Sequence, residues 1–219
     1  MVQAQWRTPW GGGAPPAALF RFSRDRQMIH PNKHLAGWQG ILQADAYSGY
    51  NDLYLADRHP GPVRSALCWS HARRKFFELA DIAGNARKNK PAHDISPAAL
   101  EAVKRIDAIF AIEREINGTG ADARLAVRQE RSRPLVEKLH TWLLDERARM
   151  SKHNSVAKAI DYLMPPKGER WDAFAAFLHD GRIPPVSGKL SAALLLLYFS
   201  GGRDRMMTWD IHRNVRLRC

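Results

Sequence analysis

The chain has few cysteines, few acidic residues and no long apolar run, and each shortage excludes a class of protein. Its two cysteines, Cys68 and Cys219, cannot form the disulfide framework of a small secreted domain. The longest apolar run, residues 192–199, is far shorter than the roughly 20 residues that a membrane helix requires. Residues 1–16 contain no apolar signal core. We therefore expect a cytoplasmic protein with no membrane partner.

The acidic residues are too few to balance the basic ones. Lys and Arg total 34 against 22 Asp and Glu, which gives a formal net charge of +12. Residues 1–14 contain no acidic side chain, and residues 184–219 contain no Glu. A chain with this charge attracts polyanions, and nucleic acid is the usual partner. The alternative is a protein that is merely rich in arginine, without a nucleic-acid site.

The first 80 residues have the pattern of an α/β protein. Hydrophobic residues make up 45% of the chain, enough for a folded core. Short apolar stretches at 17–22, 41–44 and 63–67 predict strands. His30-Pro31 predicts a chain break, followed by a short helix over 33–38. Apolar residues at helical spacing over 47–54 and 69–79 predict two further helical segments.

Residues 97–180 form a mostly helical block in this interpretation. Ser96 followed by Pro97 is typical of a helix start, and Asn117-Gly118 of a helix end. Further helices are expected over 122–131, from Pro134 onward, over 154–164 and around 171–178. After Ile183 these regular caps and apolar stripes are absent, and the composition changes.

Asp45 is the first candidate for chemistry, because it follows the predicted strand 41–44 and precedes a helical segment. Carboxylates at the carboxyl ends of strands are well placed to bind metals or substrates in α/β proteins. Asp is also common as a helix N-cap or turn residue, so the position alone leaves both interpretations open.

Two other clusters could bind ligands. Cys68 and His71 have a spacing that could begin a zinc site, but a buried thiol and a capping or core histidine explain them as well. Basic side chains that could contact DNA phosphates occur in two groups. The alternative is that these side chains only form a solvated surface. These candidates are Arg73, Arg74 and Lys75 on a predicted helix, and Arg87, Lys88 and Lys90 in a predicted loop.

Several strings of residues between about 15 and 183 together resemble the insertion-sequence-66 family of DDE transposases. The most specific pair is Leu-Gln-Ala-Asp-Ala-Tyr at 42–47 with Cys-Trp-Ser-His-Ala-Arg-Arg-Lys-Phe-Phe at 68–77. The other matching strings lie at 15–18, 22–26, 34–37, 111–116, 128–132 and 177–183.

The resemblance implies an RNase H-like fold with a large, mainly helical insertion. Enzymes of this kind cleave and join DNA with two magnesium or manganese ions held by three carboxylates, which clamp the attacking and leaving oxygens. Asp45 matches the second carboxylate. The first lies upstream of the matched region, and the third is a Glu shortly after the Asp-Gly-Arg-Ile string. Here that string, 180–183, is followed by Pro-Pro-Val-Ser-Gly without a Glu.

The resemblance therefore implies a transposase fragment that lacks two of three catalytic carboxylates and has a partial RNase H-like fold with an incomplete sheet. We expect an irregular segment at 1–14, the partial core at 15–80, the helical insertion at 81–183, and a frameshifted or foreign tail at 184–219. The parent activity is metal-dependent DNA transposition, and we expect this chain to be inactive and to bind no metal tightly. The alternative is a non-catalytic remnant that binds transposon ends, target DNA or full-length transposase subunits at the nucleoid.

Overall fold

The computed structural model describes residues 19–23, 25, 27–80, 96–166, 170–185 and 196–200. The fold is mixed α/β and mostly helical. It divides into two compact units. The first contains Gly12–Ser65 and the strand at 196–200, and the second contains Ala66–Val186. The three strands predicted from the sequence are present as β-strands within the first 67 residues. The predicted helical block lies in the second unit.

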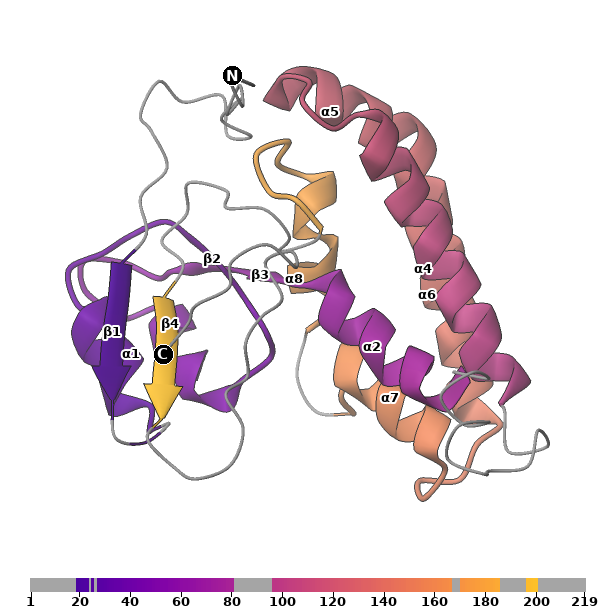
Figure 1. Cartoon of the computed structure of the whole chain (residues 1–219), viewed down its shortest axis with the longest axis horizontal. Coiled ribbons are helices and arrows are strands. Elements are labelled where there is room, and N and C mark those ends of the chain that lie inside the picture. The colour runs from indigo at the N-terminus through magenta and orange to yellow at the C-terminus, as the bar shows by residue number, and fades with distance from the viewer. Residues whose placement is uncertain are drawn as a thin grey trace, which may run out of the picture. The chain divides into compact units, whose positions relative to one another are not determined.

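In the first unit, the strands β1 (Leu19–Ser23) and β4 (Leu196–Ser200) lie side by side (Figure 1). They pair in parallel, with Leu19 opposite Leu196 and Ser23 opposite Ser200. The β1 strand agrees with the apolar stretch predicted there. The β4 strand lies in the segment after Ile183, where the sequence showed no regular pattern, so its pairing was not predicted.

A second two-stranded sheet joins β2 (Ile41–Ala44) to β3 (Arg64–Leu67). The segment between them contains the 3-10 helix η1 (Ser48–Tyr54). Leu42, Leu53 and Val63 are buried together with Leu35, and Trp38, Tyr50 and Tyr54 pack around them. Burying an aliphatic side chain of this size contributes about 1.5–3 kcal/mol, so this cluster holds the two strands and η1 together.

The helix α1 (Ile29–His34) corrects the expectation for 33–38. It begins before Pro31 and ends where the predicted helix was to begin. Pro31 lies in the first turn, where its missing N–H has no helical acceptor to lose. After the helix, the Arg58 guanidinium donates to the backbone oxygens of Leu35, Ala36 and Trp38, which fixes the irregular segment in place of further helical turns.

The second unit is a helical assembly built on four longer helices. They are α2 (Trp69–Ala80), α4 (Pro97–Glu115), α6 (Arg133–Ala148) and α7 (Ser155–Leu163). In Figure 1, α4 and α6 run side by side, and α2 and α7 lie next to each other, in agreement with their contacts. The buried faces carry the apolar residues expected from the spacing, including Trp69, Phe76, Ile106, Leu139 and Ile160.

The ends of these helices follow the local signals in the sequence. The Ser96 hydroxyl accepts a hydrogen bond from the Ala99 amide, at 3.3 Å, and Pro97 occupies the first turn of α4. Asn154 caps α7 in the same way, through the Val156 amide at 2.7 Å. After α4, Gly118 has a φ of 87°, a left-handed conformation that favours glycine. The caps satisfy amides that have no partner within the helix.

Shorter elements complete the second unit. They are α5 (Ala121–Val127), the π-helical turn η3 (Arg128–Ser132), α8 (Trp171–Ala175) and the 3-10 turn η4 (Ala176–Leu178). The helix expected over 122–131 is thus confirmed as α5 running into a π turn. Among the helices of the described ranges, none combines the length and apolar character needed to cross a bilayer.

Candidate functional site

Asp45 directly follows β2, as expected, and its side chain is partly buried. It does not cap the following helix, because the N-cap position of η1 is Tyr47 and no side chain caps that helix. Within the described residues, the Asp45 carboxylate has no hydrogen bond or ion pair. A half-buried carboxylate that binds no neighbouring donor is available to an incoming cation or ligand.

The charge of Asp45 acts on the pKa of Tyr54, which lies at the end of η1. Burial is the main cause that raises the pKa of the Tyr54 phenol above its ordinary value of 10.0. The negative charge of Asp45 raises this pKa further, and the nearby Ser65 hydroxyl opposes the shift. Asp45, Tyr54 and Ser65 therefore share one polar neighbourhood where β2, η1 and β3 meet.

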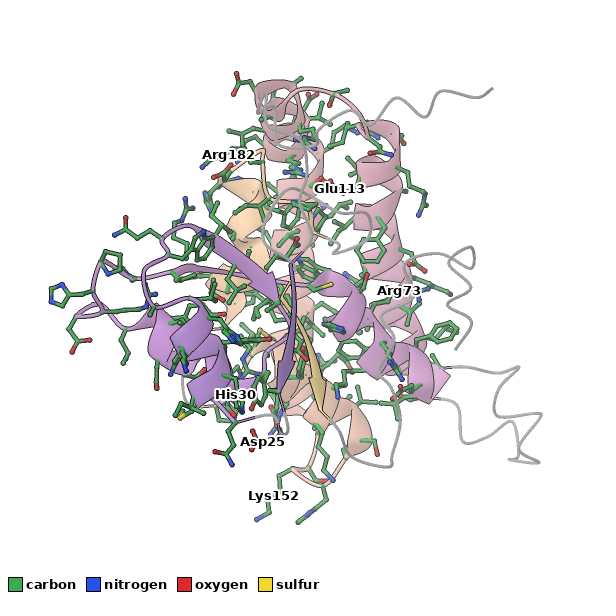
Figure 2. The ribbon with its side chains drawn as sticks, turned by 60° about the vertical axis from the view of Figure 1, so that its left-hand side comes forward. Asp25, His30, Arg73, Glu113, Lys152 and Arg182 are labelled. Atoms are coloured by element: carbon green, nitrogen blue, oxygen red, sulfur yellow. The ribbon has the colours of Figure 1, made fainter. Side chains whose placement is uncertain are left out.

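No group of three or more His, Cys, Asp or Glu side chains that could hold a metal is formed by the residues the structure describes. Two other acids near Asp45 in sequence have partners of their own. Asp52 accepts a hydrogen bond from Asn32, at 2.9 Å. Asp25 lies 2.7 Å from the His30 imidazole and also accepts the Gln27 amide (Figure 2). These contacts lower the pKa of Asp25, with the Gln27 amide as the largest cause.

The three consecutive cations on α2 differ in their surroundings. Arg73 donates two hydrogen bonds to the Asp107 carboxylate, at 2.6 and 2.9 Å, which raises the pKa of the guanidinium. Arg74 pairs with Glu78 one turn later, at 2.9 Å, and both side chains are exposed. Arg87, Lys88 and Lys90, the second predicted cluster, lie outside the described residues.

Lys75 is the member of the α2 cluster that has no ion pair within the described part of the chain. Its side chain is exposed, and its ammonium lies 5.3 Å from the centre of the Tyr162 ring on α7. A cation over an aromatic face is attracted to the ring without losing its charge. Within the described residues, therefore, no carboxylate competes with an anion from solution for Lys75.

Cys68 and His71 lie at the start of α2, as their positions in the sequence suggested. Cys68 is buried, and its carbonyl accepts the His71 amide at 3.2 Å in the first helical turn. The neighbouring Trp69 is fully buried and donates its indole N–H to the Phe174 carbonyl, at 2.9 Å. The burial of Cys68 agrees with the structural interpretation of that thiol, and no third metal ligand joins the pair among the residues that can be placed.

Sequence reasoning missed the most completely buried charge in the described structure. The side chain of Arg128 is 0% exposed, and it pairs with Glu113 on α4 through two hydrogen bonds, Nε to Oε1 at 2.8 Å and Nη2 to Oε2 at 2.7 Å. Its remaining nitrogen, Nη1, donates to the carbonyl oxygens of Phe177 and Ile183, at 3.2 and 2.9 Å. One guanidinium thus connects α4, η3 and the segment after α8.

The segment held by Arg128 is also fixed by its neighbours. Gln129 donates its side-chain amide to the Leu178 carbonyl. Gly181 packs so closely on α5 that an added Cβ would lie 1.9 Å from the Ala121 backbone oxygen. Pro185 accepts the Trp69 amide at 2.9 Å, which ties the end of this segment to the start of α2.

The strings at 111–116, 128–132 and 177–183, which carry much of the resemblance, meet at this buried network. The apolar periodicity of a helix cannot identify a buried arginine, because such an interpretation assigns every Arg to the surface. Arg124, one turn before Arg128, is also buried, and nothing in the sequence marks either arginine as a core residue. Burial is the largest cause that lowers the pKa of Arg124, and the charge of Arg128 adds to that effect.

Comparisons with known proteins agree with the matching strings. The model of the transposase IS66 family matches residues 2–187. Three uncharacterized proteins of Sinorhizobium fredii (strain NBRC 101917 / NGR234) are similar to the chain. The protein y4hP is 53% identical over 187 residues, which cover 85% of this chain and 33% of y4hP. The protein y4jD is 38% identical, covering 83% of this chain and 33% of y4jD.

The third relative, y4qI, is 35% identical, covering 85% of this chain and 32% of y4qI. The chain thus spans about a third of the length of these curated relatives. No solved structure matches it. Because the family model covers most of the chain, from residue 2 to residue 187, the chain belongs to the transposase IS66 family.

Proposed function

We propose that the chain carries part of the machinery of DNA transposition, in which divalent metal ions promote DNA cleavage and strand transfer. In this proposal, Asp45 is one of the carboxylates that bind magnesium or manganese. The observation that carries it is the Asp45 carboxylate itself, which follows β2, is partly buried and has no hydrogen bond or ion pair within the described residues. Membership of the transposase family supplies the reaction class.

The proposal extends to the organisation of the chain. Residues 15–80 would represent part of an RNase H-like core, residues 81–183 a helical insertion, and residues 184–219 a tail that diverges from the family. The pairing of β2 with β3 beside Asp45, and the helical second unit, are compatible with this division. DNA is the proposed partner, so the proposed place of action is the bacterial nucleoid.

The 219 residues alone are proposed to have little or no catalytic activity. Two metal ions that clamp a phosphodiester require several converging carboxylates, because each ion carries a double charge and binds oxygen ligands. Asp45 by itself supplies one such group. The cations of the chain can still bind DNA, and the formal net charge of +12 favours a non-catalytic DNA-binding role as the second candidate.

DNA binding is the test that both candidates must pass. The whole chain is titrated against a fluorescein-labelled DNA duplex at several salt concentrations, and anisotropy reports the bound fraction. We expect the logarithm of the affinity to fall linearly with the logarithm of the salt concentration, as phosphate contacts require. A folded chain that does not bind the duplex at low salt would contradict the proposal.

A further inference from the structure

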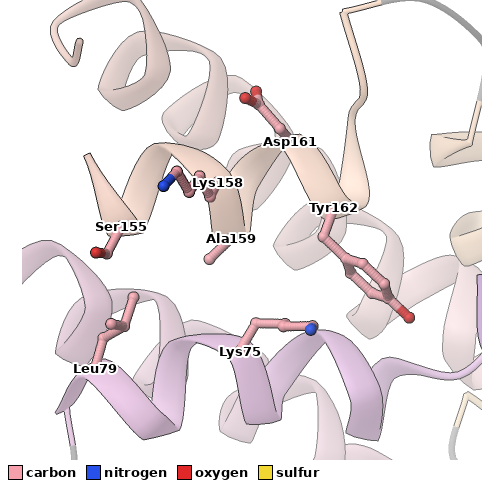
Figure 3. A pocket seen from close by; sticks show the side chains of 7 residues that line it. All are labelled: Lys75, Leu79, Ser155, Lys158, Ala159, Asp161 and Tyr162. Carbon is pink, nitrogen blue, oxygen red and sulfur yellow. The ribbon is translucent and has the colours of Figure 1, made fainter. Parts of the chain in front are cut away.

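A groove runs between α2 and α7 in the second unit, with a volume of about 430 Å³. In Figure 3, Lys75 and Leu79 approach it from α2, and Ser155, Lys158 and Tyr162 from α7. The side chain of Lys75 extends toward the Tyr162 ring (Figure 3). Each of the two facing helices thus contributes one lysine to the same open groove.

The charge of this groove is positive, because its one acidic lining residue is already neutralised. Asp161 accepts hydrogen bonds from Arg147 Nε and Nη2, at 2.6 and 3.1 Å. Both side chains of this pair are about three-quarters buried, so the pair is a fixed part of the wall. Lys75 and Lys158 have no ion pair among the residues that the structure describes, so no acid of that part of the chain compensates their two charges.

Tyr162 gathers positive charge at one end of the groove. Lys75 Nζ lies 5.3 Å from the centre of its ring, and the Arg170 guanidinium carbon lies 5.7 Å from it. Arg170 is held there by a hydrogen bond to the Tyr162 carbonyl, at 2.7 Å. Because neither cation contacts a carboxylate in these interactions, the ring collects them without neutralising them.

A second groove of the same unit shows that this charge is not a general property of its surface. It has a volume of about 420 Å³ and is lined by residues of α4 and α6. Arg105 and Lys138 there are accompanied by Glu137 and Asp145, and Arg105 is itself paired with Glu101 at 2.8 Å. A groove that contains two acids and two bases has no net attraction for a polyanion.

We propose that the groove between α2 and α7 binds the phosphate backbone of DNA, with Lys75 and Lys158 as the contacting cations. This inference rests on the proposed function and names the surface through which it acts. A phosphodiester carries one negative charge and acceptor oxygens, which match two ammonium groups on facing helices. The contacts are to the backbone, so binding through the groove is independent of base sequence.

The test compares two double variants of the whole chain in the anisotropy titration. Lys75→Gln with Lys158→Gln removes the two charges of the groove. Lys104→Gln with Lys138→Gln removes two exposed lysines of α4 and α6 and serves as the matched control. For the groove variant we expect roughly tenfold weaker binding and a salt dependence whose slope is smaller by about 1.8, because each lost phosphate contact lowers it by about 0.9.

The control variant is expected to keep the wild-type slope, and both variants are expected to melt at the wild-type temperature. Equal losses in the two variants would overturn the groove and leave general DNA binding in place. An unchanged groove variant would also overturn it. Wild-type protein that binds no duplex would contradict the proposed function itself. Binding of poly-glutamate, but not DNA, through the two lysines would reassign the groove to an acidic protein.

Discussion

Arg128 forms a two-pronged ion pair with Glu113, at 2.7 and 2.8 Å, in which the arginine side chain is fully buried and that of Glu113 is 13% exposed. The pair joins the π turn η3 to α4, and the guanidinium also holds the carbonyl oxygens after α8. A planar guanidinium suits this role because its donors point toward a carboxylate and toward carbonyls at the same time.

Replacing Arg128 with Gln is expected to destabilise the second unit strongly. The change leaves the Glu113 carboxylate and the carbonyl oxygens of Phe177 and Ile183 without their donor. Removing one partner of a buried ion pair costs about 3–5 kcal/mol, which approaches the whole stability of many domains. Urea unfolding followed by circular dichroism measures the loss.

Arg131→Gln is the matched control for that substitution. Arg131 lies on the same π turn and pairs with Glu115, two residues after Glu113, at 2.6 Å, but both side chains are about half exposed. Solvent screens such a pair, so we expect the free energy of unfolding to stay near the wild-type value. If the two arginine variants unfolded at the same urea concentration, burial would not be what gives Arg128 its importance.

Replacing Gly181 with alanine is expected to lower the stability of the protein, because the added methyl group has no room. An added Cβ would lie 1.9 Å from the Ala121 backbone oxygen and 2.6 Å from its carbonyl carbon, so a helix backbone would have to move. Overpacking of this kind costs about 1–3 kcal/mol or more. Thermal unfolding of Gly181→Ala should therefore occur at a lower temperature than that of the wild type.

Gly37→Ala provides the comparison, because no atom beyond the adjoining residues lies within 4 Å of the Cβ that it would gain. That variant should melt at or slightly above the wild-type temperature, since alanine restricts the unfolded chain more than glycine does. A Gly181→Ala protein as stable as Gly37→Ala would show that the approach of α5 to this turn is looser than described.

His140 should make stability fall in mild acid. Its ring stacks on Trp171, with the centroids 4.4 Å apart, and burial lowers its pKa below 6.5, while the charge of Asp172 partly offsets the shift. A lowered folded-state pKa means that the unfolded chain takes up this proton more readily than the folded chain. The contribution of neutral His140 is thus complete above pH 6.5 and is lost as the pH falls through its folded-state pKa.

Melting temperatures at pH 7.5 and 5.5 test this effect. In His140→Gln the difference between the two temperatures should be smaller than in the wild type. His153→Gln changes an exposed histidine in the loop before α7 and should keep the wild-type difference. An equal pH dependence in His140→Gln and the wild type would remove His140 as a cause.

The helices were predictable because their signals are local. Ser96 and Asn154 cap helices where the sequence placed helix starts, and the buried residues of α2, α4, α6 and α7 follow the apolar spacing. The strand before Asp45 was predictable for the same reason, and it placed that carboxylate correctly at the end of β2. Caps and periodicity act within a few residues, so one sequence contains them.

The remaining features depend on residues that are distant in sequence. The pairing of β4 with β1 joins residues 177 positions apart in sequence, such as Leu19 and Leu196, and no local pattern indicates it. Arg128 could not be distinguished from a surface arginine, because its partners come from α4 and from the segment after α8. The α1 helix ends earlier than predicted because Arg58, which is distant in sequence, binds the backbone oxygens that follow the helix.

The most direct test of the account is whether the chain cuts the DNA that it binds. Supercoiled plasmid is incubated with Mn²⁺ and enough of the whole chain to saturate binding, and gel electrophoresis follows the plasmid with time. Because one carboxylate, the proposed metal ligand Asp45, cannot hold two metal ions, we predict that the plasmid stays supercoiled. Accumulation of nicked circles that Asp45→Asn abolishes would contradict it, since these 219 residues would then assemble a complete metal site.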